Sequence, residues 1–116
     1  MNLNKLIINI LSKATGMPVS QDEYDGKADK YIIFTYTDER PELFGDNKAL
    51  ADVAYLQIQM ITPKSYNYFA MKKVIRDTLE DAGFITQSIT SFLGDVYNGT
   101  EKIRQTIFEV MYSESR

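Results

Sequence analysis

The chain has 116 residues, of which 44% are apolar and 25% are charged, a composition typical of one compact domain with its own core. It contains neither cysteine nor histidine, which excludes disulfides, thiolate metal sites and the most common general base of enzymes. The formal net charge is −3, and Lys72-Lys73 is the only adjacent pair of basic residues, which argues against a protein that grips phosphate backbones. From this length and composition we expect a single domain over residues 1–116. The apolar run "LIINIL" is too short for a membrane span or a signal core, so we also expect the protein to be soluble and not exported.

The first predicted element is a helix over about residues 2–14. Its apolar residues follow the three-and-four spacing of one helical face, and they are Leu3, Leu6, Ile7, Ile10, Leu11 and Ala14. Gly16 and Pro18 then supply stop signals. Residues 19–30 are polar and turn-rich, which predicts a loop, and the β-branched and aromatic run "YIIFTYT" after them predicts a strand.

The segment that follows this strand, "DERPELFGDNKALAD", is predicted to be a loop because Pro41 and Gly45 punctuate it. A second strand is expected over about residues 51–62, and Pro63 would end it.

A second helix is predicted behind that strand, with an apolar stripe formed by Tyr68, Met71, Ile75, Leu79 and Ala82. Ser65 or Asn67 can cap its start, and Gly83 lies just beyond its end. The chain then predicts a strand from Phe84 to Leu93, a turn in "GDVYNGT" and a final strand from Ile103 to Tyr112. The predicted order is therefore α-β-β-α-β-β, an α+β fold with a largely antiparallel sheet and both helices packed on one face.

Two predicted strands carry apolar residues on both faces. In "VAYLQIQMITP" the residues Leu56, Ile58 and Met60 supply a core, while the other face carries Tyr55, Gln57 and Gln59. The last strand alternates in the same way, with Thr106, Phe108, Val110 and Tyr112 between Ile103, Gln105, Ile107, Glu109 and Met111. If both helices cover one face of the sheet, the opposite face exposes a mixture of apolar and polar side chains. Such a face is either an interaction surface or an ordinary scatter of exposed apolar residues.

Carboxylates are the only catalytic candidates present in quantity. Asp22, Glu23 and Asp25 precede the first predicted strand, and Asp38 and Glu39 follow it, so a small Mg²⁺-dependent nuclease is one alternative. Their spacing matches no metal loop, and turns favour Asp on conformational grounds. We interpret them as solvated loop residues, and we expect no enzyme, no cofactor and no metal. A small-ligand-binding domain is a further alternative and would need a pocket dotted with polar groups.

Three phrases add to the order of elements: "FGDNK" between two predicted strands, "AYLQIQMIT" leading into the second helix, and "AGF" at the end of that helix. Together they resemble the tail completion proteins of long-tailed phages, also called tail terminator or tail-to-head joining proteins. The resemblance covers nearly the whole chain.

The resemblance implies a structural role without a reaction, cofactor or metal. Such proteins form a ring, typically six-fold, that caps the tail tube and presents a surface to the head connector. The implied partners are further copies of this chain, the tail tube protein and the head connector protein. DNA passes through the ring without specific binding, and neither a membrane nor a small-molecule substrate is involved. The implied location is the tail–head junction of the virion, after assembly in the host cytoplasm.

The resemblance also implies that the loop from Glu39 to Ala49 reaches a neighbouring subunit or the end of the tail tube. It further implies that the strand face with Gln57 and Gln59 looks toward the channel or a neighbouring subunit. The expected assembly residues are Glu39, Arg40, Leu43, Phe44, Asp46, Tyr55, Gln57 and Gln59. Within the same broad class, a head-completion or connector protein of the phage neck is the alternative.

Overall fold

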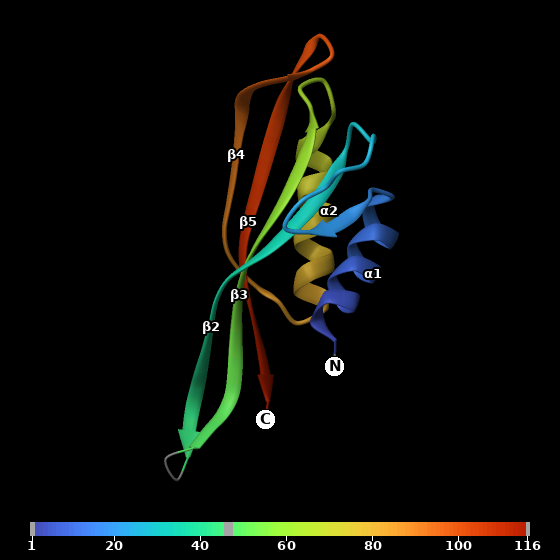
Figure 1. Cartoon of the computed structure of the whole chain (residues 1–116). Helices are drawn as coiled ribbons and strands as arrows, with labels where there is room; N and C mark the ends of the chain where they lie inside the picture. Colours follow the sequence, from blue (N-terminus) through green and yellow to red (C-terminus); the bar gives the residue numbers. More distant parts are fainter. Residues whose placement is uncertain (1, 46–47, 116) are drawn as a thin grey trace.

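The computed structural model describes residues 2–45 and 48–115 and has an α+β fold (Figure 1). Its elements are α1 (Leu3–Thr15), β1 (Val19–Gln21), β2 (Tyr31–Gly45), β3 (Lys48–Pro63), α2 (Tyr68–Asp81), β4 (Ile85–Asn98) and β5 (Glu101–Ser115). The strands form one sheet in the order β1-β2-β3-β5-β4. β1 pairs in parallel with β2, and every other described pairing is antiparallel. The predicted α+β class and largely antiparallel sheet are therefore confirmed.

Both helices lie against the same face of the sheet, as Figure 1 shows. Ile7 and Leu11 of α1 and Ile75 and Leu79 of α2 are fully buried there. The strand residues that complete this core are Ile32, Phe34, Leu56, Ile58, Met60, Phe108 and Val110. Alternation along each strand directs these side chains toward the helices, which confirms the core face predicted for β3.

The helix ends follow local capping rules. The side-chain oxygen of Asn2 accepts a hydrogen bond from the Lys5 N–H at the start of α1, and Gly16 ends that helix with φ of +71°. Of the two residues proposed to cap α2, Asn67 does so, since its side-chain oxygen accepts from the Ala70 N–H. In the described part of the chain, neither helix is long and apolar enough to cross a membrane.

Three predictions about the strands were wrong. The turn expected in "GDVYNGT" is limited to Gly99 and Thr100, because β4 continues to Asn98. Residues 19–30 were expected to be loop throughout, but Val19–Gln21 pairs alongside Ile32–Phe34 as β1. The segment after "YIIFTYT" was also expected to be a loop, yet β2 continues to Gly45 and pairs back onto β3 as far as Lys48. Pro41 is compatible with this strand because β1 pairs only with Ile32–Phe34, so that the rest of β2 runs along the edge of the sheet.

The continuation of β2 and β3 forms a projecting hairpin, which we call the arm and define as Asp38–Gly45 paired with Lys48–Tyr55. Among the described residues, β5 accompanies β3 as far as Ala51, and beyond that point β2 and β3 pair as a two-stranded ribbon. The arm extends away from the helices (Figure 1) and gives the molecule a length of 59 Å against 25 Å in the other directions. An isolated two-stranded hairpin is at best marginally stable in water, so the outer part of the arm depends on its continuity with the larger sheet.

Candidate functional site

The sheet face opposite the helices, which we call the open face, carries the predicted glutamines. Gln59 lies between Ile33 of β2 and Ile107 of β5 in the strand register, and all three side chains are partly buried. Gln57 lies in the next row, between Thr35 and Glu109. The centre of the open face thus places one amide between aliphatic groups and the next between a hydroxyl and a carboxylate, so it offers hydrogen bonds and apolar contact to the same partner.

The rim of the open face is more apolar. Ile85 pairs with Met111 and is 57% exposed, and Phe92 pairs with Gln105 and is 42% exposed. Val96 and Tyr97, in the outer part of β4, are exposed as well. Exposed apolar groups of this kind that lie on one strand are typical of an interaction surface.

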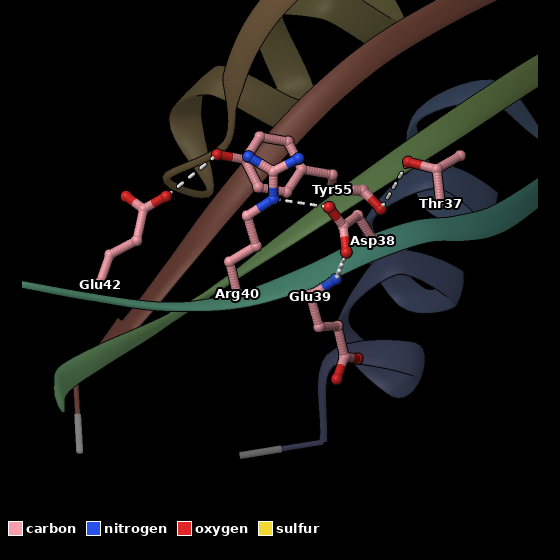
Figure 2. A network of polar contacts seen from close by, with 6 residues as sticks. All are labelled: Thr37, Asp38, Glu39, Arg40, Glu42 and Tyr55. Carbon is pink, nitrogen blue, oxygen red and sulfur yellow. Dashed lines mark hydrogen bonds and ion pairs between the residues drawn. The ribbon is translucent and has the colours of Figure 1, made fainter.

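A β-bulge at the root of the arm decides which side chains share a face. Tyr36 pairs with Leu56 and Asp38 pairs with Tyr55, so Thr37 is an extra residue on β2. Its hydroxyl donates a hydrogen bond of 3.1 Å to the Tyr55 carbonyl (Figure 2). The extra residue shifts the alternation by one, so that Asp38 and Arg40 lie on the open face and Glu39 lies on the helix side.

Arg40 and Tyr55 form the centre of a polar cluster on the open face. The Arg40 guanidinium carbon lies 5.3 Å from the Tyr55 ring centroid, and Arg40 Nε donates to Asp38 Oδ2 over 2.6 Å (Figure 2). The Tyr55 hydroxyl donates to Glu42 Oε1 over 3.3 Å. The hydrogen bond from Arg40 holds the pKa of the Asp38 carboxyl below its usual range, and the same contact raises the pKa of Arg40. Both groups therefore remain charged at neutral pH.

Glu39 lies on the other side of the sheet, in a cleft of about 230 Å³ between α1 and the root of the arm. We call this the arm cleft, and its lining is Leu3, Tyr36, Glu39, Asp52, Val53, Ala54, Tyr112 and Glu114. Asp52 pairs directly with Glu114 across β3 and β5, which places two carboxylates side by side. Burial, together with the charges of Glu39 and Glu114, raises the pKa of the Tyr36 hydroxyl. The arm cleft is thus acidic at its rim and apolar at its floor.

The eight residues predicted for assembly do not form one surface. Arg40 and Tyr55 lie together on the open face, Gln57 and Gln59 continue that face, and Glu39 is on the helix side. The side chains of Leu43 and Phe44, and all of Asp46, lie outside the described part of the chain.

The sequence interpretation missed several residues that complete these surfaces, namely Thr37, Asp38, Glu42, Asp52 and Glu114. The alternation in "TDERPE" was the available signal for a strand, but Pro41 favoured a loop, and a loop assigns no faces.

The carboxylates considered for a nuclease do not converge. Asp22, Glu23 and Asp25 are exposed between β1 and β2, whereas Asp38 is bonded to Arg40. Among residues 2–45 and 48–115, no three His, Cys, Asp or Glu side chains are grouped so that they could hold a metal ion.

Comparison with known proteins finds a similarity of three-dimensional structure and none of sequence. No protein-family model matches the chain, and no curated protein sequence matches it. Among solved structures, one protein whose name carries no functional information is similar at 11% sequence identity, with a TM-score of 0.53. The similar region covers 98% of this chain and 92% of that protein. At this identity the similarity concerns the fold alone.

Proposed function

We propose that this protein is a structural subunit of a ring that caps the tail tube of a long-tailed phage and joins it to the head connector. The observation that carries the proposal is the open face, where Gln59 lies between two partly buried isoleucines and Gln57 and Tyr55 continue the same side of the sheet, away from both helices. In an assembled ring this face would look toward the channel or a neighbouring subunit. Uncharged amides there would neither trap nor strongly repel passing phosphates.

The sheet edges support assembly with further copies. β4 is the last strand in the sheet order, and β2 runs beyond the short β1 for most of its length. Long edge strands present backbone N–H and C=O groups that can pair with another chain. The arm adds a hairpin that can reach past the body of its own subunit.

The sequence phrases that resemble tail completion proteins are consistent with these features. The described residues of "FGDNK", Phe44, Gly45 and Lys48, belong to the outer part of the arm, and "AYLQIQMIT" covers the part of β3 that carries the open face. The second phrase thus supplies both the core residues Leu56, Ile58 and Met60 and the residues of the open face.

The test is electron microscopy of lysates from the parent phage or prophage after deletion of this gene. Tails of uncontrolled length beside DNA-filled, tailless heads are the expected result. Tails of normal length beside heads that leak or lack DNA would instead place the protein on the head side of the neck. Unaltered particles would refute both roles.

A further inference from the structure

The first turns of α2 present an exposed aromatic side chain between two cations. Phe69 is 52% exposed, and the Nζ atoms of Lys72 and Lys73 lie 4.3 Å and 5.0 Å from its ring centroid. A ring face attracts cations, so the two ammonium groups are held around one apolar side chain. We call Phe69, Lys72 and Lys73 the α2 patch.

The α2 patch is positively charged, although the chain as a whole carries a formal charge of −3, and the next turn of α2 is mixed, since Arg76 is ion-paired with Asp77. Residues 2–15 and 68–76 contain no Asp or Glu, and their basic residues are Lys5, Lys13, Lys72, Lys73 and Arg76. Ile8 and Val74 are 37% and 40% exposed on the same two helices. A surface with both properties suits a partner that is negatively charged and also apolar, which favours protein over a phosphate backbone.

The arm cleft has this complementary character within the same chain. Glu39 supplies negative charge at its rim, while Leu3, Ala54 and Tyr112 supply apolar surface. In the arm cleft, the ring of Phe69 from another copy could contact apolar side chains while Lys72 and Lys73 lie close to a carboxylate. Arrangements of this kind raise association rates and disfavour wrong partners.

We propose that the α2 patch of one subunit docks into the arm cleft of the next. The start of α2 lies at the end of the helix layer far from the arm, and the start of α1 lies at the other end (Figure 1). The arm cleft is lined by Leu3 at the start of α1, so the two surfaces belong to opposite ends of the helix layer. One copy therefore uses the two surfaces toward two different neighbours, which is a heterologous, head-to-tail contact of the kind that builds rings. The inference deepens the proposed ring assembly and rests on it.

The experiment is sedimentation equilibrium of the full chain and of charge-reversal variants. Wild type is expected to self-associate. Lys72→Glu with Lys73→Glu, and separately Glu39→Lys, should each weaken association by at least about tenfold, because like charges then face each other. Combining all three changes in one chain should restore association in part. Lys27→Glu with Lys64→Glu, two exposed lysines outside both surfaces, is the matched control and should associate like wild type.

Circular dichroism of each variant separates loss of contact from loss of fold. The inference would be overturned if the wild type stayed monomeric at its highest soluble concentration. It would also be overturned if neither the lysine double variant nor Glu39→Lys changed the strength of self-association. Sensitivity to the lysine changes without sensitivity to Glu39→Lys would overturn the assignment of the arm cleft. If the lysine changes abolished binding to a duplex DNA probe and left self-association intact, the α2 patch would be a phosphate-binding surface instead.

The failure of this inference is distinguishable from failure of the proposed function. Sedimentation involves no tails, whereas the deletion experiment reads only tails and heads. Loss of tail-length control in the deletion strain, combined with self-association that ignores the charge reversals, would refute the docking contact and leave the tail-end role standing.

Discussion

The guanidinium of Arg40 lies over the ring of Tyr55, 5.3 Å from its centroid, at the point where the arm leaves the body of the sheet. The bulge at Thr37 makes this contact possible, because it brings Arg40 onto the same face as Tyr55. The orientation of the arm therefore depends on Thr37, the extra residue of the bulge, and on Asp38 and Arg40, whose side chains the bulge places on the open face.

Replacement of Tyr55 tests the contribution of this contact to stability. Tyr55→Ala should lower the free energy of unfolding by about 1–3 kcal/mol, because a partly buried ring and its cation–π contact are both lost. Tyr55→Phe should change it by less than about 0.5 kcal/mol, since the 3.3 Å hydrogen bond to Glu42 is long and partly exposed. Urea denaturation measures both, and equal effects of the two variants would show that the hydroxyl matters more than the ring.

The pKa of Asp38 should depend on Arg40. Because the hydrogen bond from Arg40 stabilises the ionised carboxylate, Asp38 should titrate below the usual range of an aspartate, and Arg40→Ala should raise its pKa toward that range. A lowered folded-state pKa contributes stability above the unfolded-state pKa and loses it as the pH falls through the folded-state value. The stability difference between wild type and Arg40→Ala should therefore shrink in acid. Carboxyl NMR titration checks this, with Arg76→Ala as the control that leaves Asp38 unchanged.

Two phenylalanines on opposite faces of the sheet should differ sharply in their effect on stability. Phe108 is fully buried beneath the helices, and Phe108→Ala should cost about 3–5 kcal/mol through lost contacts and the cavity that remains. Phe92 is 42% exposed on the open face, and Phe92→Ala should cost less than about 1 kcal/mol. Thermal unfolding of the free chain measures both. A large cost at Phe92 would mean that the open face is covered in the free protein.

The arm tip should matter for assembly more than for folding. Phe44 pairs through its backbone with Ala49 in the two-stranded part of the arm. We expect Phe44→Ala to retain the thermal stability of wild type and to reduce incorporation into tail ends, measured by electron microscopy of complemented lysates. A large loss of thermal stability would instead assign Phe44 to the folded core.

The assignment of the open face to the channel can be tested by adding charge to it. Gln57→Lys with Gln59→Lys places two cations beside passing phosphates, so ring assembly or DNA delivery should fall, as read from particle morphology and infectivity. Asn9→Lys with Ala14→Lys adds the same charge to exposed positions of α1 and should have less effect on delivery. If the glutamine variant assembled and delivered DNA normally, the channel assignment would lose its support.

Both helices were predictable because their signals are local. The apolar spacing in residues 2–14 and 68–82 matches α1 and α2 closely, and the side chains of Asn2 and Asn67 cap neighbouring backbone groups. The two faces of β3 and β5 were predictable for the same reason, since strict alternation needs no knowledge of the partner strand.

The arm was not predictable from local signals. Pro41 and Gly45 favour a loop when read alone, yet the segment is a strand because β3 pairs with it along its length. β1 was missed for a similar reason, since Val19–Gln21 is short and polar and is held by its pairing with Ile32–Phe34. Tertiary pairing can override weak local preference in strands.

Local patterns were therefore enough to predict both helices, the choice of Ser65 or Asn67 as the cap of α2, and the core residues of β3. Only the tertiary structure decided that Glu39 and Arg40, neighbours in the chain, serve opposite faces, and that Asp52 and Glu114 meet beside Glu39. The reason is physical: helical periodicity and capping involve residues a few positions apart, whereas strand register and bulges are fixed by hydrogen bonds between segments far apart in the chain.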